Sequence, residues 1–213
     1  MVQQQPHDDL KATVSQMLTA RARRDGALFD GSVEEVLHRL REEFGLDVVF
    51  VSEFIDGQRM FRFVDRSDDS PAIEAGDFGE LEASFCQRVV DGRIPQFIAD
   101  VSRLGPEVDL PVLPMRIGTH LGVPVVMGDG STFGTLCGFS TVPSSKVRER
   151  DMPLLRECAE LVARKLDLAR SLGLHEPPPS WSSRRGARYH SDVWKLRGAW
   201  ALNEVGRHAF LES

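Results

Sequence analysis

The feature that most constrains the fold is the segment LGVPVVMGDGSTFGTLCGFS at residues 121–140, in which two runs of strand-forming residues flank a glycine-rich turn. β-Branched residues in these runs favour an extended, half-buried backbone, and Gly128-Asp129-Gly130 between them predicts a β-hairpin. Gly134 and Gly138 remove side chains from the second strand, which leaves room for a neighbouring segment or a small ligand. The segment therefore predicts an antiparallel strand pair with space on one face.

A second hairpin is predicted earlier in the chain. Strand-forming residues at 48–54 and 59–64 flank Asp56-Gly57, and Asp-Gly is a strong signal for a two-residue hairpin turn. A short strand is also predicted over 94–98. Because tight hairpins join antiparallel strands, we expect a mainly antiparallel sheet.

Helices are predicted where apolar residues recur at spacings of three and four. They cover residues 8–24, 32–45, 80–90 and 148–172. The second helix is expected to begin at Ser32, whose hydroxyl would cap the first turn while Glu35, three residues later, completes a capping box.

Three prolines interrupt the segment between the short strand and the long hairpin, at positions 106, 111 and 114. Proline removes a backbone donor and restricts φ, so a long helix or strand cannot form there. We expect residues 103–118 to form a loop that closes over a site like a lid.

The order of helices and strands predicts an α+β fold with one core. The chain has 213 residues, which is enough for one domain of about 150 residues with extensions. We expect an N-terminal helical extension at 1–28, a domain at 29–173, and a Pro/Ser/Arg-rich linker with a short amphipathic tail at 174–213.

Charge and hydropathy exclude several classes of protein. The net charge is −6, whereas proteins that coat nucleic acids carry clustered Lys and Arg, so no nucleic-acid partner is expected. No apolar run approaches the roughly 18 residues that a membrane span needs, so no membrane association is expected either. The N-terminus has early acidic residues and lacks the apolar segment of a secretory signal, which predicts a cytoplasmic protein.

The sequence contains no recognisable metal-binding or hydrolase motif. Its three cysteines, Cys86, Cys137 and Cys158, are widely spaced without a CxxC pair, which argues against structural zinc and against a disulfide scaffold. Cys137 and Cys158 fall in apolar patterns where a free cysteine acts as a small buried hydrophobe. G-x-S-x-G, HExxH and Walker motifs are absent, so neither a metal site nor hydrolase chemistry is predicted.

Three blocks stand in order along the chain: FGLDVVFVSEFIDGQRMFRFVD at 44–65, SFCQRVVDGRIPQFIADVS at 84–102 and HLGVPVVMGDGSTFGTLCGFS at 120–140. Together they resemble the GAF sensory domains, in particular those found ahead of GGDEF, EAL and other bacterial signalling output domains. The resemblance runs from about residue 29 to residue 168. It implies a PAS/profilin-like central antiparallel sheet, with the terminal helices on one face and a ligand pocket on the other. It also implies a homodimer whose end helices pair and pass a signal to a partner protein.

Seven residues are candidates for a site that binds an unidentified small molecule. Such sites combine apolar walls with a few convergent polar groups. The predicted walls are Phe63, Phe85 and Phe139, and the predicted polar members are Cys86, Asp100, Arg116 and His120. Each has a plainer alternative: the phenylalanines could be core, Asp100 could bond backbone at a strand end, and Arg116 could be a solvated cation rather than a clamp for a carboxylate or phosphate.

The resemblance does not identify a cofactor. His120 is a conceivable haem ligand, but Pro114 occupies the position that aligns with the histidine of several haem-binding relatives. Bilin-binding relatives use a cysteine in the loop before the fourth strand, and residues 103–120 contain none. The cofactor is therefore unknown, and neither haem nor a covalent bilin is favoured.

We expect a non-enzymatic sensor that binds a small molecule and relays its presence through the terminal helices. One alternative is an enzyme similar to relatives that reduce free methionine sulfoxide, with Cys86 as the nucleophile, although the 103–118 loop lacks the second cysteine expected there. Another alternative is a ligand-free dimerisation or docking module, in which Trp194 and Trp200 of the tail contact a partner.

Overall fold

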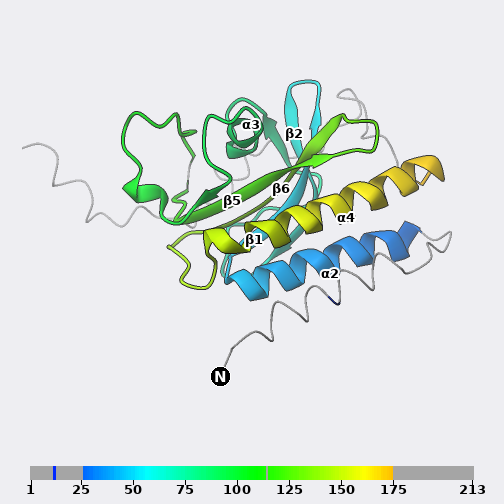
Figure 1. The fold of residues 1–213 in the computed structure, drawn as a ribbon, viewed down its shortest axis with the longest axis horizontal. Coiled ribbons are helices and arrows are strands. Elements are labelled where there is room, and N and C mark those ends of the chain that lie inside the picture. The colour runs from blue at the N-terminus through cyan, green and yellow to red at the C-terminus, as the bar shows by residue number, and fades with distance from the viewer. Residues whose placement is uncertain (1–11, 13–25, 114, 175–213) are drawn as a thin grey trace, which may run out of the picture.

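A six-stranded antiparallel sheet forms the centre of the molecule (Figure 1), in a computed structural model that describes residues 12, 26–113 and 115–174. Its strand order is β3-β2-β1-β6-β5-β4. The strands are β1 (Val48–Ile55), β2 (Gln58–Arg66), β3 (Phe78–Glu80), β4 (Phe97–Ile98), β5 (Thr119–Val126) and β6 (Thr132–Ser140). Every neighbouring pair is antiparallel, which confirms the predicted α+β architecture.

Both predicted hairpins are present. The β1–β2 turn places Asp56 and Gly57 at φ values of 50° and 73°, the left-handed backbone that a two-residue hairpin turn requires and that Asp-Gly tolerates well. In the β5–β6 turn, the Met127 amide donates to the Ser131 carbonyl at 2.8 Å. Gly130 adopts a φ of 83° there, a left-handed conformation that glycine adopts more readily than residues with a side chain.

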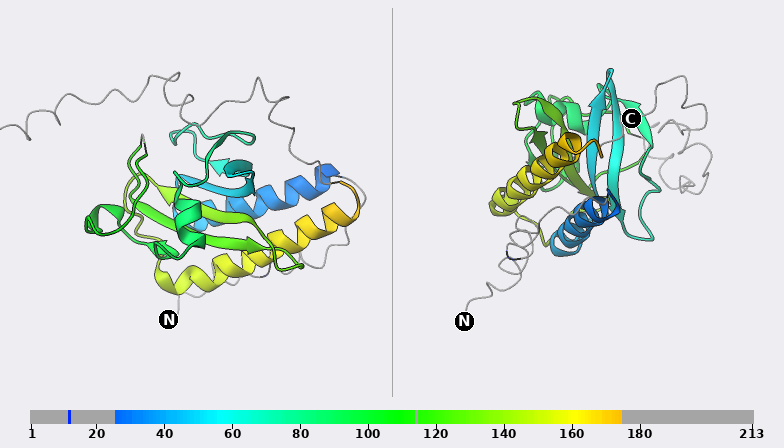
Figure 2. Two further views of the ribbon diagram at one scale, coloured as in Figure 1. Left: turned by 90° about the horizontal axis from the view of Figure 1, so that it is seen from above. Right: turned by 90° about the vertical axis from the view of Figure 1, so that its right-hand side faces the viewer.

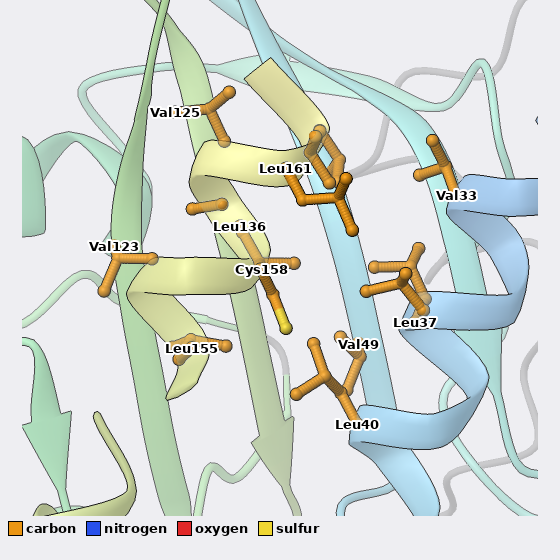
Figure 3. Close-up of a cluster of buried hydrophobic side chains, with 14 of the residues drawn as sticks. Val33, Leu37, Leu40, Val49, Val123, Val125, Leu136, Leu155, Cys158 and Leu161 are labelled. Atoms are coloured by element: carbon orange, nitrogen blue, oxygen red, sulfur yellow. The ribbon is translucent and has the colours of Figure 1, made fainter. Parts of the chain in front are cut away.

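Two long helices cover one face of the sheet. Figures 1 and 2 show α2 (Gly26–Phe44) and α4 (Met152–Ser171) side by side beneath the strands. Their apolar stripes meet inward-facing strand residues in one cluster (Figure 3), which buries hydrophobic area as the main stabilising contribution. The labelled members are Val33, Leu37, Leu40, Val49, Val123, Val125, Leu136, Leu155, Cys158 and Leu161.

A separate hydrophobic cluster covers the other face of the sheet. Successive strand residues point to opposite faces, so Val49 and Val51 of β1 pack under the helices while Val48 and Phe50 belong to the second cluster. The short helix α3 (Phe85–Val90) and parts of the loops that follow it lie over this second face. The central strands are therefore buried on both sides.

Several predicted boundaries are corrected by the structure. α2 begins at Gly26, so Ser32 lies inside the helix and does not cap it. A cap contributes only about 1 kcal/mol to helix stability. The helix therefore continues upstream of Ser32, through good helix formers such as Ala27 and Leu28. The helix predicted at 80–90 begins at Phe85, with the Ser84 hydroxyl accepting from the Gln87 amide at 3.2 Å.

The remaining boundary differences are smaller. Residues 78–80 form the edge strand β3, which pairs with β2 and was not predicted from the sequence. The strand predicted at 94–98 is reduced to β4, and the first turn of the helix predicted from 148 is the 3-10 turn η2 (Glu149–Asp151). The predicted helix at 8–24, apart from residue 12, and the predicted tail after residue 174, with Trp194 and Trp200, lie outside the described residues.

The proline-rich segment is irregular, as predicted. After the 3-10 turn η1 (Val101–Arg103), the described part of the loop contains no helix or strand until β5 begins at Thr119. In the parts of the chain that the structure describes, no helix combines the length and apolar character needed to cross a bilayer.

We predict that packing between α4 and the sheet dominates the stability of the domain. Leu155→Ala, at a side chain with 0% exposure, should lower the free energy of unfolding by about 2–5 kcal/mol because it removes buried methyl groups and leaves a cavity. Leu168→Ala makes the same substitution on the same helix at 40% exposure and should change it by about 0.5 kcal/mol or less. Urea titration of both variants measures the difference, and equal losses would contradict the prediction.

Candidate functional site

The second face of the sheet brings together four of the seven predicted site residues. Phe85 and Cys86 come from α3, and Phe139 comes from β6; all three belong to the second hydrophobic cluster. His120 of β5 lies opposite Phe139 in the strand register. Its ring packs on Phe85 with centroids 4.6 Å apart. A short helix and two central strands therefore hold these side chains in one buried layer.

His120 is an unusual member of this layer. Its residue is 3% exposed, and its Nδ1 atom has no hydrogen-bond partner. Burial lowers the pKa of His120 to about 3, so the imidazole is neutral near pH 7. A buried polar atom without a partner costs on the order of 1–3 kcal/mol, which makes this nitrogen an available position for hydrogen bonding to a ligand.

A glycine on β5 makes room beside His120. A Cβ atom at Gly122 would lie 2.7 Å from the Cys137 sulfur and 3.4 Å from Cε1 of His120. The first distance is too short for a carbon and a sulfur in contact, so any side chain at this position would displace Cys137. Gly122 therefore permits the close approach of these two polar side chains on neighbouring strands.

Thiols and hydroxyls form a connected patch next to His120. The Cys86 sulfur lies 3.8 Å from the Cys137 sulfur and accepts from the Ser52 hydroxyl at 3.8 Å. The Ser52 and Thr135 hydroxyls are 2.9 Å apart, and the Cys137 thiol donates to Thr135 at 3.2 Å. We call Ser52, Cys86, Thr135 and Cys137 the thiol–hydroxyl patch.

The two thiols of this patch have opposite pKa shifts. Burial by itself raises the pKa of Cys86, but its hydrogen bond with Cys137 and the positive charge of Arg59, with smaller contributions from two hydroxyls, outweigh it and lower this pKa to about 5. Burial, together with the hydrogen bond and charge of Cys86, raises the pKa of Cys137 well above its ordinary value. Cys86 is therefore the thiol that ionises first.

Arg59 is the cation of this environment. It lies on β2, is buried, and places its guanidinium 4.3 Å from the centre of the Phe61 ring. Its Nε atom has no hydrogen-bond partner. A desolvated guanidinium is a strong electrostatic neighbour for a thiolate because little water screens it.

The structure separates Phe63 from the other predicted walls. Val51 pairs with Phe63 while Ser52 pairs with Phe61, so Arg62 is an extra residue in a β-bulge, which reverses the alternation of faces. Phe63 consequently packs against the cluster beneath the long helices. Phe61 occupies the second face instead, edge-on to Phe50 at 4.7 Å. The predicted grouping of Phe63 with Phe85 is thus corrected.

Asp100 and Arg116 are not part of the buried layer. The Asp100 carboxylate accepts from the Ser102 amide at 3.0 Å and from its hydroxyl at 2.6 Å, which is the local structural role considered as its alternative. These bonds lower the pKa of Asp100. Arg116 is exposed on the proline-rich loop. A ligand contact by either residue stays a prediction.

Sequence reasoning did not select Ser52, Thr135 or Arg59. A signal was present for the first two, because Ser52 continues the every-second-residue pattern of Val48 and Phe50, and Thr135 precedes Cys137 by two positions. Each is a polar residue on a face that is otherwise apolar. Arg59 had no comparable signal, since the bulge that follows it hides the pattern of β2.

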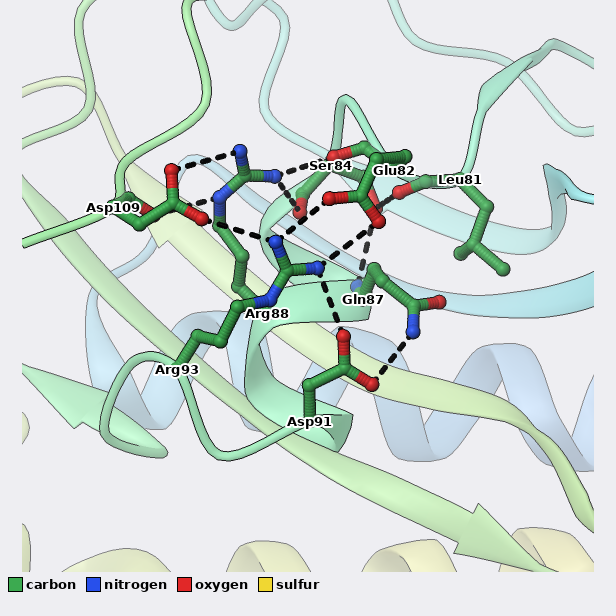
Figure 4. A network of polar contacts seen from close by, with 8 residues as sticks. All are labelled: Leu81, Glu82, Ser84, Gln87, Arg88, Asp91, Arg93 and Asp109. Atoms are coloured by element: carbon green, nitrogen blue, oxygen red, sulfur yellow. Dashed lines mark hydrogen bonds and ion pairs between the residues drawn. The ribbon is translucent and has the colours of Figure 1, made fainter.

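A polar network connects the proline-rich loop over the second face to α3 (Figure 4). Arg88 of α3 is buried and donates to the Asp109 carbonyl at 2.6 Å and to the Ser84 carbonyl at 3.2 Å, and also bonds the Glu82 carbonyl. Arg93 adds ion pairs to Glu82 at 2.7 Å and to Asp109 at 3.0 Å. The proline-rich loop is therefore anchored at Asp109.

We predict that Arg88→Met loosens this loop. The substitution keeps an apolar stem but removes hydrogen bonds from a charged donor, each contributing about 1.5–3 kcal/mol. Amide hydrogen exchange at Val108 and Leu110, whose amides bond within the loop, should accelerate about tenfold or more. Arg116→Met removes an exposed arginine from the same loop and should leave these rates unchanged. Equal acceleration in both variants would contradict an anchoring role for Arg88.

We also predict that His120 contributes to acid sensitivity. Its pKa is about 3 in the folded protein and 6.5 in an unperturbed imidazole, so between these pH values the unfolded state binds a proton and the folded state does not. Stability is consequently lost as the pH falls through this window, by about 2 kcal/mol from pH 7 to pH 5. His120→Phe should remove this part of the pH dependence, whereas His38→Phe, on the exposed side of α2, should retain it. Urea titration at both pH values measures the effect.

Comparison with solved structures shows the same fold in proteins of low sequence identity. The GAF domain of a phosphoenolpyruvate-protein phosphotransferase from Coxiella burnetii superposes with a TM-score of 0.62 at 16% identity, covering 80% of this chain and 98% of that one. A bacteriophytochrome from R. palustris gives a TM-score of 0.57 at 13% identity, covering 78% of this chain and 37% of the other. Free methionine-R-sulfoxide reductase from Neisseria meningitidis, in complex with its substrate, superposes with a TM-score of 0.55 at 17% identity, covering 78% of this chain and 92% of that one.

These similarities support the architecture and do not select among the functions of the similar proteins. No curated protein shows significant sequence similarity to the chain. The GAF domain family matches residues 29–167, a range that includes all six strands, α3 and most of both long helices. The chain is a member of the GAF domain family.

Proposed function

We propose that this GAF domain is a sensor that binds a small molecule on the second face of its sheet, against Phe85, His120 and Phe139. The observation that carries the proposal is the unpartnered Nδ1 atom of His120, buried against the aromatic side chains of the second cluster. A ligand that hydrogen-bonds this nitrogen would remove the cost of leaving it unsatisfied. Because the imidazole is neutral, a compact uncharged ligand with one polar group fits this position best.

The relay that we propose runs through the central strands. β1 and β6 contribute side chains to both hydrophobic clusters. β5 contributes to the cluster beneath the helices and carries His120 on the other face, so a shift on the ligand side changes packing beneath α2 and α4. A ligand can drive such a shift only by its difference in affinity for the two arrangements. In this proposal the protein acts in the cytoplasm as a homodimer, and α2 and α4 pass the change to a signalling partner.

In this proposal the loop at 103–118 is not an open lid that closes on the ligand but a closed segment that must open to admit it. Arg88 and Arg93 hold it at Asp109 in the structure, so ligand entry requires release of these contacts rather than closure from an open state. The prolines keep the segment irregular, which lets it separate from α3 without unfolding a helix or strand.

A ligand-retention experiment tests the proposal. The full chain, purified from its host, should carry a small molecule in native mass spectrometry, and His120→Phe should lose it because the hydrogen-bonding nitrogen is gone. His38→Phe should retain the ligand, and circular dichroism confirms that both variants are folded. A wild-type protein that carries no ligand and gains no thermal stability from a metabolite extract would contradict the proposal, and an unliganded dimer would favour the docking module.

One observation keeps the enzyme alternative open. The 103–118 loop has no cysteine, but Cys137 lies 3.8 Å from Cys86 and provides a second thiol. Incubation with free methionine sulfoxide and a thiol reductant should give no turnover if the protein is a sensor alone. Turnover that disappears in Cys86→Ser would instead establish a reductase.

A further inference from the structure

Two cysteines that are 51 positions apart in the sequence meet on the second face of the sheet. The Cys86 and Cys137 sulfur atoms are 3.8 Å apart, and the two residues are 1% and 0% exposed. A disulfide needs the sulfurs at about 2.05 Å. The approach therefore requires only a small movement of two side chains that already face one another.

The surroundings of this pair differ from those of an inert buried cysteine. Hydroxyls of Ser52 and Thr135 contact the sulfurs, and the charge of Arg59 favours a thiolate at Cys86. Cys158 provides the contrast within the same protein. It lies in the cluster beneath the long helices, where burial raises the pKa of its thiol to about 12, so it stays protonated and unreactive.

We propose that Cys86 and Cys137 are a redox site, which forms a reversible intramolecular disulfide when the protein meets a small hydroperoxide. The site requires no bound ligand, so it goes beyond the proposed sensing of a small molecule. The disulfide links α3, which covers the second face, to the central strand β6. Oxidation thereby attaches α3 covalently to the sheet.

The chemistry balances in two steps. The Cys86 thiolate attacks one oxygen of the hydroperoxide, and the O–O bond breaks. The other oxygen takes the proton that the thiol lost and leaves as water or an alcohol, and Cys86 becomes a sulfenic acid. The Cys137 sulfur then attacks the Cys86 sulfur, the S–O bond breaks, and the hydroxide leaves as water with the Cys137 proton. Two thiols are oxidised to one disulfide as one hydroperoxide is reduced, and an external dithiol reverses the change.

Access to the pair depends on α3. Both thiols are covered in the folded state, so the oxidant must be small and must enter when the short helix separates locally from the sheet. Arg88 holds α3 against the 104–113 segment through the Asp109 carbonyl. Arg88→Met should consequently accelerate disulfide formation severalfold, while Arg116→Met should leave its rate unchanged.

Disulfide mapping of the full-length protein tests the proposal directly. Trypsin places the three cysteines on separate peptides, at residues 67–88, 117–146 and 157–164. After hydrogen peroxide treatment, alkylation under denaturing conditions and digestion without reductant, we expect a linked species of the first two peptides, two hydrogens lighter than their sum. The third peptide should be alkylated throughout, and dithiothreitol should restore the separate peptides.

Matched serine variants complete the test. Cys158→Ser should form the linked species as the wild type does, whereas Cys86→Ser and Cys137→Ser should form none, and Cys137→Ser should accumulate a dimedone-reactive sulfenic acid at Cys86. The wild type decides the outcome even where a variant fails to fold. Absence of the linked species, or its replacement by bonds to Cys158 or between chains, would overturn the proposal. Ligand retention by His120 is measured separately, so either proposal can fail without the other.

Discussion

Burial of the central strands on both faces is the constraint on which the rest of this structure depends. In β1, Val48 and Phe50 face the second hydrophobic cluster while Val49 and Val51 face the long helices, and all four side chains are buried. Such strands are stable only when apolar layers cover both sides. The two long helices supply one layer, and the short helix with its following loop supplies the other.

The two layers differ in chemical character. The cluster beneath α2 and α4 consists of aliphatic, aromatic and methionine side chains, and its cysteine, Cys158, packs as a small hydrophobe. The other layer contains His120, Arg59 and the thiol–hydroxyl patch within an apolar surround. Burying these polar groups is costly unless they find partners. These groups are the reason why we propose this face as the one on which a ligand or an oxidant acts.

Fold and chemistry provide different kinds of information in this family. Proteins that share this architecture at less than 20% identity include a phosphotransferase domain, a bacteriophytochrome and a methionine sulfoxide reductase. The sheet and its helices therefore do not determine a ligand. The arguments for function rest instead on individual side chains, above all the unpartnered nitrogen of His120 and the two facing thiols.

The sequence by itself determined the elements that depend on local signals. Asp56-Gly57 specified one hairpin turn, Gly128-Asp129-Gly130 specified the other, and the apolar spacing in 148–172 specified the helix that contains Cys158. These signals act within a few residues, so they can be recognised without knowing what packs where. They were sufficient for the antiparallel sheet and its main helices.

Only the tertiary structure decided which residues meet. The bulge at Arg62, whose side chain lies 3.1 Å from Glu53, moved Phe63 to the helix side and brought Phe61 to the other, because one extra residue reverses the alternation of a strand. Cys86 and Cys137 come together because α3 folds back over β6. A contact between such distant positions depends on strand order and on the packing of whole elements, which no local pattern encodes.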